Sequence, residues 1–265
     1  MSDLDRRRFL ASLAAATLAG VGLAHATIDT RGHRRASMET VPAAATSAGL
    51  LPPPPAAGRI PLPGDGILHA LPGDGDLLAL TVDDGVSSEV VRLYTQFARD
   101  TGIRLTYFVN GVNASWTDNL ALLRPLVESG QIQLANHTWS HPDLTTISSS
   151  EIADELTRND RFITNSYGAV AKPFFRPPYG NHNETVRAVA ADLGYTATTL
   201  WNGSLADSRE ITEDYIKQMA DKYFQPQSIV IGHLNHMPVT HVYGTLVDLI
   251  RARNLRTVTL NDVFV

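Results

Sequence analysis

Short β-rich runs alternate with helix-type runs between residues 76 and 265, and this alternation limits the possible folds more than any other feature of the sequence. Seven runs favour strands: Leu77–Val82, Arg104–Val109, Gln131–Ala135, Pro173–Arg176, Thr196–Trp201, Ser228–Gly232 and Thr257–Leu260. Six further segments have apolar residues at the three- and four-residue spacing of amphipathic helices: Val90–Asp100, Asn119–Ser129, Ser149–Ser166, Asn183–Leu193, Glu213–Tyr223 and Tyr243–Arg253. The alternation predicts an α/β fold with parallel strands and helices outside them. Periodicity alone is compatible with both a barrel and an open doubly wound sheet.

The composition excludes several classes of protein. The sequence contains no cysteine, so there is no disulfide scaffold, zinc finger, iron–sulfur cluster or thiol nucleophile. Hydrophobic residues make up 43% of the chain and charged residues 18%, which is too apolar and too weakly charged for a disordered protein. Residues 76–265 carry 15 basic and 21 acidic side chains, a net charge of −6. This charge disfavours nucleic acid and other polyanions as partners.

Residues 1–26 have the order of features that an export signal requires. Three consecutive arginines, Arg6 to Arg8, precede an Ala-rich apolar run that ends in the small-x-small sequence Ala-His-Ala at residues 24–26. Paired arginines followed by x-Phe-Leu resemble a twin-arginine signal; the alternatives are the general secretory route and the basic start of an ordinary buried helix. The apolar run is too short to span a bilayer comfortably. We expect export to the periplasm, cell wall or medium, without an integral membrane span in the mature form.

Residues 27–75 hold 8 of the 15 prolines, including the run Pro52–Pro55. Proline runs favour extended polyproline II and cannot build a helix or a central strand. We expect a Pro-rich linker, followed by an N-terminal extension whose apolar residues pack on the folded domain; a plain linker throughout is the alternative. The predicted organisation is therefore a signal at 1–26, linker and extension at 27–75, and one α/β domain at 76–265.

Ionisable residues stand where several of the predicted strands end. Asp83 and Asp84 follow the first strand, His137 and His141 the third, Arg176 the fourth, Asp207 the fifth, and His233 the sixth. In parallel α/β folds the carboxyl ends of the strands open onto the active site. Because five separate loops deliver ionisable groups to the same rim, the sequence predicts an enzyme.

Two histidines four residues apart, in His137-Thr-Trp-Ser-His141, indicate a metal site. Thr138 follows the first histidine, so the zinc-protease helix with its glutamate base is absent. Two imidazoles and one carboxylate of the Asp83-Asp84 pair fit Zn²⁺, Co²⁺ or Fe²⁺ better than Mg²⁺. The second carboxylate then deprotonates metal-bound water, a hydrolase arrangement. The alternatives are a solvated Asp-Asp-Gly turn and two unrelated histidines.

Four ordered motifs carry a resemblance to a known family. They are Thr81-Val-Asp-Asp-Gly85, His137-Thr-Trp-Ser-His141, Arg176-Pro-Pro-Tyr-Gly180 and Ile231-Gly-His233. Together they resemble the polysaccharide deacetylases of the NodB-homology type, carbohydrate esterase family four, over residues 76–265. The resemblance implies a distorted (β/α) barrel with about seven parallel strands. It also implies an amidase or esterase that acts on acetylated sugars with a divalent metal, best matched by Zn²⁺, with Co²⁺ or another transition metal as the alternative.

The resemblance assigns roles to the residues of the first three motifs. Asp83 matches the catalytic base and Asp84 the metal-binding carboxylate, while His137 and His141 match the two metal-binding imidazoles. Arg176 matches the arginine that orients the base, and its fixed charge keeps a buried carboxylate ionised.

The remaining matches concern the oxyanion, the leaving group and the substrate. Tyr179 matches the tyrosine whose backbone N–H binds the oxyanion; the two preceding prolines have no N–H to offer. His233 matches the general acid, and Ile231 replaces the leucine that usually lines the acetyl-methyl pocket. We expect Tyr179, Ile231 and Trp201 to contact substrate.

A further motif of the family, which lies between the third and the last of these four, departs from the family pattern in this sequence. Trp201 is present, but Ser204 and Ser208 stand where the pattern has an aspartate and a tryptophan. Asp207 falls where the second aspartate is expected, and we assign it as the partner that raises the pKa of His233. The missing tryptophan changes the predicted substrate groove beside His233.

The leading functional prediction is metal-dependent removal of N-acetyl groups from an exported or cell-wall glycan that contains N-acetylglucosamine, of peptidoglycan or chitin type. An O-acetyl esterase that acts on a polysaccharide such as acetylxylan is the first alternative, because these motifs do not encode the choice between amide and ester. A non-catalytic, metal-binding carbohydrate-binding domain is the second.

Overall fold

The computed structural model describes residues 50–56, 58–64 and 66–265. Within this range one compact unit spans Leu51–Val265. The predicted export signal and most of the predicted linker lie outside the described residues. Among those that are described, no helix has both the length and the hydropathy to cross a membrane.

A single nine-stranded sheet forms the centre of the unit, and all pairings between its strands are parallel. The strands are β1 (Ile67–Leu68), β2 (Leu77–Asp84), β3 (Leu105–Val109), β4 (Ile132–Asn136), β5 (Phe174–Phe175), β6 (Ala197–Thr199), β7 (Gly203–Ser204), β8 (Ser228–His233) and β9 (Arg256–Thr257). Their order is β1-β6-β5-β4-β3-β2-β8-β7, with β9 also beside β2. Since β2 to β6 are neighbours in chain order, the sheet winds in one direction. The prediction of a barrel-like fold is confirmed, and the doubly wound alternative is wrong.

Each of the first six β-rich runs overlaps a strand, and the structure adds the two-residue strands β1 and β7. The prediction for the last run is largely wrong, because it shares only Thr257 with β9 and Leu260 begins a helix. Thr259 caps that helix in a reciprocal capping box with Asp262, which ends the extended conformation. Among the described residues, no pairing joins β7 to β1, so the barrel is open on that side.

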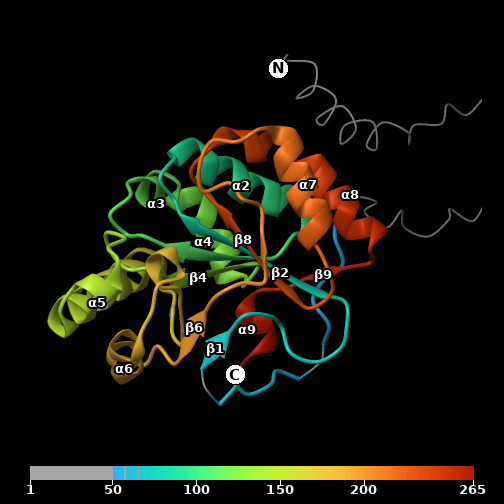
Figure 1. Ribbon diagram of the computed structural model, residues 1–265. Helices are drawn as coiled ribbons and strands as arrows, with labels where there is room; N and C mark the ends of the chain where they lie inside the picture. The colour runs from blue at the N-terminus through green and yellow to red at the C-terminus, as the bar shows by residue number, and fades with distance from the viewer. Residues whose placement is uncertain (1–49, 57, 65) are drawn as a thin grey trace, which may run out of the picture. The chain divides into compact units, whose positions relative to one another are not determined.

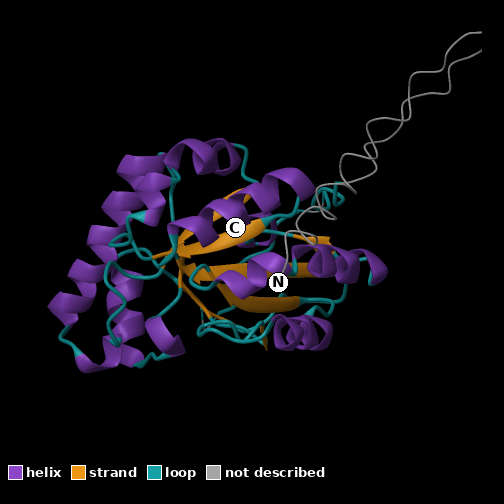
Figure 2. Cartoon of the chain, turned by 90° about the horizontal axis from the view of Figure 1, so that it is seen from above, coloured by secondary structure: helices purple, strands orange, loops and turns teal. Residues whose placement is uncertain are grey.

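The six predicted helices all form, and they surround the strands in Figure 2. They are α2 (Ser88–Thr101), α4 (Leu120–Glu128), α5 (Ser149–Tyr167), α6 (Glu184–Asp192), α7 (Glu213–Tyr223) and α8 (Tyr243–Ala252), with short additional helices α3 (Ser115–Asp118) and α9 (Leu260–Val263). Ser148 and Glu151 form the capping box that starts α5. Left-handed Gly102 ends α2.

The two faces of the curved sheet belong to different cores. Along β2, Leu78, Leu80 and Val82 join the large cluster under the outer helices, whereas Ala79 joins a smaller cluster inside the barrel. Alternation along a strand then turns Asp83 to the same inner side as Ala79. The C-terminal helix α9, labelled below the strands in Figure 1, supplies apolar side chains to this inner cluster.

The described part of the N-terminal extension packs on the domain. Leu51 is buried in the large cluster, and its N–H donates to Thr101 O at 2.7 Å. Ile60 bridges Phe264 near the C-terminus, and β1 pairs with β6. The sheet therefore includes chain that precedes residue 76.

Candidate active site and metal centre

The inner face of the barrel collects the site residues at the carboxyl ends of the strands. Asp83, Ile231 and His233 lie at even spacing from the inner-cluster residues Ala79 and Ile229 on β2 and β8. The same alternation places His137 after β4 and Arg176 after β5 on this side. The rim predicted from the sequence is thus a consequence of strand register.

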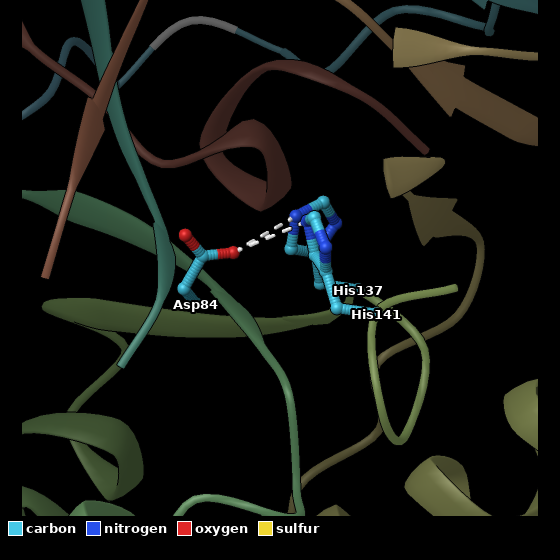
Figure 3. A group of neighbouring side chains, drawn as sticks. All are labelled: Asp84, His137 and His141. Carbon is cyan, nitrogen blue, oxygen red and sulfur yellow. Dashed lines mark ion pairs between the residues drawn. The ribbon is translucent and has the colours of Figure 1, made fainter. Parts of the chain in front are cut away.

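Asp84, His137 and His141 converge on one point, as Figure 3 shows. Asp84 Oδ1 lies 3.3 Å from His137 Nε2 and 3.5 Å from His141 Nε2. One ligand atom from each residue lies within 4.8 Å of the others. Asp84 Oδ1 is buried and has no hydrogen-bond partner, which is costly unless a cation or proton fills the space beside it. The donor set of two imidazoles and one carboxylate therefore fits a divalent transition metal.

Left-handed backbone makes this convergence possible. Asp84, Thr138, His141 and Tyr179 have φ values of 75°, 70°, 63° and 60°, a conformation that costs non-glycine residues about 1–3 kcal/mol each. The turn at Asp84 departs from strand alternation and brings its carboxylate beside that of Asp83. Gly85 follows with φ 82°, and a Cβ there would lie 2.4 Å from the Trp116 ring. This tryptophan is buried and therefore packs under the turn.

Arg176 organises two residues of the site at once. Its side chain is fully buried, and Nη1 donates to Asp83 Oδ1 at 2.6 Å. Its backbone carbonyl accepts a hydrogen bond from His137 Nδ1 at 2.7 Å. A carbonyl can only accept, so Nδ1 carries a proton, and in the neutral imidazole the lone pair of His137 Nε2 faces Asp84. Arg176 Cζ also lies 4.1 Å from the centre of the Phe108 ring.

His233 and Asp207 form a second pair across the site from the histidine ligands. His233 Nδ1 lies 3.0 Å from Asp207 Oδ1, and both side chains are largely buried. Burial lowers the pKa of His233, but the hydrogen bond and charge of Asp207 outweigh it and raise this pKa above its ordinary value. The structure thus joins the two residues that the sequence analysis paired.

The altered motif at residues 201–208 shapes the loop that carries Asp207. Ser204 Oγ accepts a hydrogen bond from Ala206 N–H at 2.9 Å, and Ala206 adopts φ 59°. This tight turn directs Asp207 inward. Ser208 is exposed, so the side of the site next to the Asp207 loop is not covered by a large side chain from that position.

The three predicted substrate contacts lie around the same opening. The Tyr179 side chain is 65% exposed, and its ring meets His141 edge to face at 4.7 Å between centroids. Ile231 is buried on β8 at the inner face. Trp201 is half-buried, under Gly180 and 5.4 Å from Arg176 Cζ. Trp201 therefore also supports the loop that carries Tyr179.

Burial and the charges within the cluster shift the pKa values of Asp84, His137 and His141 in different directions. Burial alone would raise the pKa of Asp84, but the neighbouring imidazole of His137, together with the charge of His233 and the hydrogen bond from Asn235, holds it well below its usual range. Burial lowers the pKa of His137, yet the carboxylates of Asp83 and Asp84 raise it above its ordinary value. Burial and the charge of His137 lower the pKa of His141. A cation that binds here replaces a proton on the buried imidazole.

Several supporting residues were not predicted from the sequence. Asn136 Oδ1 accepts hydrogen bonds from Thr138 N–H and from Asn159 Nδ2, at 2.9 and 2.8 Å. Asn159, on α5, also receives Gly111 N–H at 2.9 Å. Both asparagines are buried polar residues on an otherwise apolar strand or helix face. This pattern was the sequence signal that could have pointed to them, but it does not identify their hydrogen-bond partners.

The polysaccharide deacetylase family model matches residues 71–198, the segment that contains the first two motifs and the Arg-Pro-Pro-Tyr-Gly loop. Over this segment the chain is similar to the polysaccharide deacetylases. Its motifs occur in that family's order, on the strands where the resemblance predicts them.

The names of three curated relatives refer to three different glycans, which are chitin, xylan and peptidoglycan. The chain is 35% identical over 132 residues to chitin deacetylase 1 of Cryptococcus neoformans var. grubii, covering 50% of this chain and 27% of that protein. It is 32% identical over 132 residues to a bifunctional xylanase/xylan deacetylase of Cellvibrio japonicus, covering 48% of this chain and 19% of that protein. It is 25% identical over 190 residues to a peptidoglycan-N-acetylglucosamine deacetylase of Bacillus cereus, covering 69% of this chain and 66% of that protein. The chain therefore spans less than two thirds of each relative's length.

Solved structures share the fold. A chitin deacetylase from Colletotrichum lindemuthianum superposes with a TM-score of 0.67 at 22% identity, covering 76% of this chain and 93% of the other. A family 4 carbohydrate esterase pseudoenzyme from Bacillus anthracis gives 0.66 at 20% identity, covering 76% and 71%. The fold thus occurs with and without activity, so function must be argued from the site.

Proposed function

We propose that this chain is a metal-dependent deacetylase that removes N-acetyl groups from an exported or cell-wall glycan containing N-acetylglucosamine. The observation that carries the proposal is the position of three groups around one opening. These are the Asp84–His137–His141 cluster, the carboxylate of Asp83 held by Arg176, and the imidazole of His233 held by Asp207. Export through a twin-arginine signal at residues 1–26 is part of the proposal and rests on the sequence alone.

Asp84, His137 and His141 are the residues that would hold the metal, and Zn²⁺ suits them best. When bound there, the metal supplies a Lewis acid that polarises the acetyl carbonyl and lowers the pKa of water. The chain's own groups then divide the proton transfers between two sides of the site.

Asp83 is the base in this proposal. Arg176 engages Oδ1, whereas Oδ2 lies 3.6 Å from His137 Nε2, beside the metal cluster. Oδ2 accepts the proton from the attacking water as the new C–O bond forms. The backbone N–H of Tyr179 donates to the oxyanion, because neither preceding proline has an N–H.

His233 is the acid. As the C–N bond breaks, His233 donates a proton to the nitrogen, so the products are acetate and the free amino sugar. An amine anion is a very poor leaving group, and an amide therefore depends on this donation more than an ester does. The raised pKa of His233 supports an amide substrate, because the imidazole keeps its proton to higher pH.

An O-acetyl esterase that acts on acetylated xylan is the second candidate. It is favoured by the 32% identity over 132 residues to the bifunctional xylanase/xylan deacetylase. A non-catalytic, metal-binding glycan-binding domain is the third, since one structural neighbour is a pseudoenzyme. The full set of base, acid and metal-ligand matches argues against the third candidate.

Acetate release from N-acetylated chitooligosaccharide and from acetylated xylan, with and without chelator, separates the three candidates. We expect chelator-sensitive release from the chitooligosaccharide. Preference for acetylxylan would favour the esterase, and binding without turnover would favour the glycan-binding domain. Activity that persists in chelator would contradict the metal assignment.

Asp83→Asn tests the base directly. We expect kcat to fall by about 10²–10⁴, the usual contribution of a general base, while Zn²⁺ affinity is retained because Asp84 and both imidazoles are intact. Asp100→Asn, half-buried near the end of α2 and paired there with Arg99, is the control and should keep full activity. Wild-type turnover in the Asp83 variant would exclude this role.

A further inference from the structure

Asn235 connects the loop after β8 to the carboxylate that closes the metal cluster. Its Nδ2 donates to Asp84 Oδ2 at 2.6 Å, across 151 positions of sequence. Its Oδ1 accepts a hydrogen bond from Val86 N–H at 3.2 Å. A backbone N–H can only donate, so it fixes which end of the amide is the oxygen, and Nδ2 must face Asp84.

The two oxygens of Asp84 therefore have different surroundings. Oδ1 points at both imidazoles and has no hydrogen-bond partner, whereas Oδ2 points away from the rings toward Asn235. Figure 3 shows this orientation, with the dashed lines to both rings starting from a single oxygen of Asp84. The hydrogen bond engages Oδ2, the oxygen that Asp84 would have to turn toward the cation in order to bind through both oxygens.

We propose that Asn235 is a positioning residue that restricts Asp84 to binding the metal through Oδ1 alone. This inference rests on the proposed function, in which Asp84, His137 and His141 hold the metal. Three protein ligand atoms leave positions free for water and for the acetyl oxygen, as catalytic metal sites require. If Asp84 bound through both oxygens, it would occupy one of those positions.

The backbone near Asn235 supports this role. Leu234 N–H donates to Asp83 O at 3.0 Å, and Ser87 N–H donates to Leu234 O at 3.2 Å. The loop after β8 is therefore tied to the loop after β2 on both sides of the metal-binding carboxylate. Asn235 therefore acts from a fixed platform, with both ends of its amide engaged by protein atoms.

A second asparagine offers a matched control. Asn113 Nδ2 donates to the backbone carbonyl of Asp84 at 3.0 Å and leaves the carboxylate untouched. Both asparagines are half-buried. Asn235→Leu and Asn113→Leu thus remove the same kind of hydrogen bond to the same residue, and only the first releases the carboxylate.

The test measures metal binding by the purified metal-free chain, without substrate. Zn²⁺ affinity is measured by competition with a chromophoric chelator, and visible absorption of the Co²⁺-loaded chain reports the coordination number. We expect Asn235→Leu to weaken Zn²⁺ binding by about 10- to 100-fold, as losses of outer hydrogen bonds to metal ligands do. We also expect weaker Co²⁺ absorption, because a second oxygen raises the coordination number. Asn113→Leu should stay close to wild type in both measurements.

Three results would overturn the proposal. One is a wild-type Zn²⁺ affinity and Co²⁺ spectrum in Asn235→Leu; another is equal weakening in both asparagine variants, which would mean that only loop structure is involved. Absence of Zn²⁺ binding by the wild-type chain would overturn the proposed metal site as well, so the two failures are distinguishable. Asn235→Ser, whose hydroxyl is too short to reach Asp84, gives the same readout if the Leu variant does not fold.

Discussion

Asp83 offers two carboxylate oxygens, and the protein engages them differently. Oδ1 forms the 2.6 Å pair with buried Arg176, while Oδ2 faces the metal cluster. His233 is arranged likewise, because Nδ1 pairs with Asp207 and leaves Nε2 for a substrate. In both cases one atom fixes the orientation and the charge of the group, and the other is the atom that transfers a proton in the proposed mechanism.

Asp207→Asn tests the acid at the level of one residue. The carboxylate raises the pKa of His233, so the protonated acid is present below this pKa and is lost as pH rises through it. An amide at position 207 removes the charge and lowers the pKa, so the basic limb of kcat/KM must move to lower pH. A pH–rate profile on N-acetylated chitooligosaccharide measures the shift. Ser208→Ala, next to Asp207 but exposed, should leave the profile in place, and an unchanged limb in Asp207→Asn would contradict the pairing.

At the scale of elements, α5 supports the loop that carries both histidine ligands. Glu155 accepts hydrogen bonds from Ser140 N–H and from Ser140 Oγ, each at 2.7 Å. This loop contains the left-handed residues Thr138 and His141, whose conformation persists only because the surrounding structure holds it. A helix on the outside of the barrel therefore influences the spacing of the ligands inside it.

Glu155→Leu should loosen this loop. The substituted side chain has no hydrogen-bond acceptor, so both bonds from Ser140 are lost, and we expect a loss of about 1–2 kcal/mol of stability and roughly 10-fold weaker Zn²⁺ binding. Denaturant unfolding and Zn²⁺ titration measure the two effects. The neighbouring exposed carboxylate provides the control, and Asp154→Asn should change neither. Equal effects of the two variants would attribute the change to charge on α5 and not to the loop.

Elements with their own sequence signals could be predicted, and those set by distant contacts could not. The helix α5 has its capping box and periodicity in the sequence, and β2 has a continuous apolar run. The two-residue strands β1 and β7 have no such signal, because pairing with β6 and β8 makes them strands. The motif residues were found because they follow predicted strands. Asn235 was not found, because its partner Asp84 is 151 positions away.

At the scale of the whole molecule, the residues of the proposed metal site come from separate strands. Asp84 follows β2, whereas His137 and His141 follow β4. A cation that binds all three binds only the folded chain, so it stabilises that state by RT ln(1 + [M]/Kd). At a free Zn²⁺ concentration of 100 Kd this amounts to about 2.7 kcal/mol.

Removal of the metal should therefore lower the melting temperature. For a domain of this size we expect a difference of about 5–10 °C between the Zn²⁺-saturated and the chelated chain, measured by calorimetry. His141→Ala, at the half-buried edge of the cluster, should remove most of the difference. An equal melting temperature with and without Zn²⁺ would contradict the site.

The C-terminal segment completes the inner core, and this packing can be tested by substitutions outside the proposed active site. The strands present small residues inward, such as Ala79, Ala135 and Ala197, and Phe264 fills the space beside them with its ring 6.2 Å from that of Phe174. Phe264→Ala leaves a cavity, because short side chains cannot collapse into it, and should cost about 3–5 kcal/mol. Since Phe264 also bridges Ile60, protease cleavage of the N-terminal extension should accelerate in the same variant. Val265→Ala removes an exposed neighbour and should have little effect on either measurement. If Phe264→Ala destabilised the chain without faster cleavage near Ile60, the extension would be held by other contacts, such as that of Leu51 with Thr101.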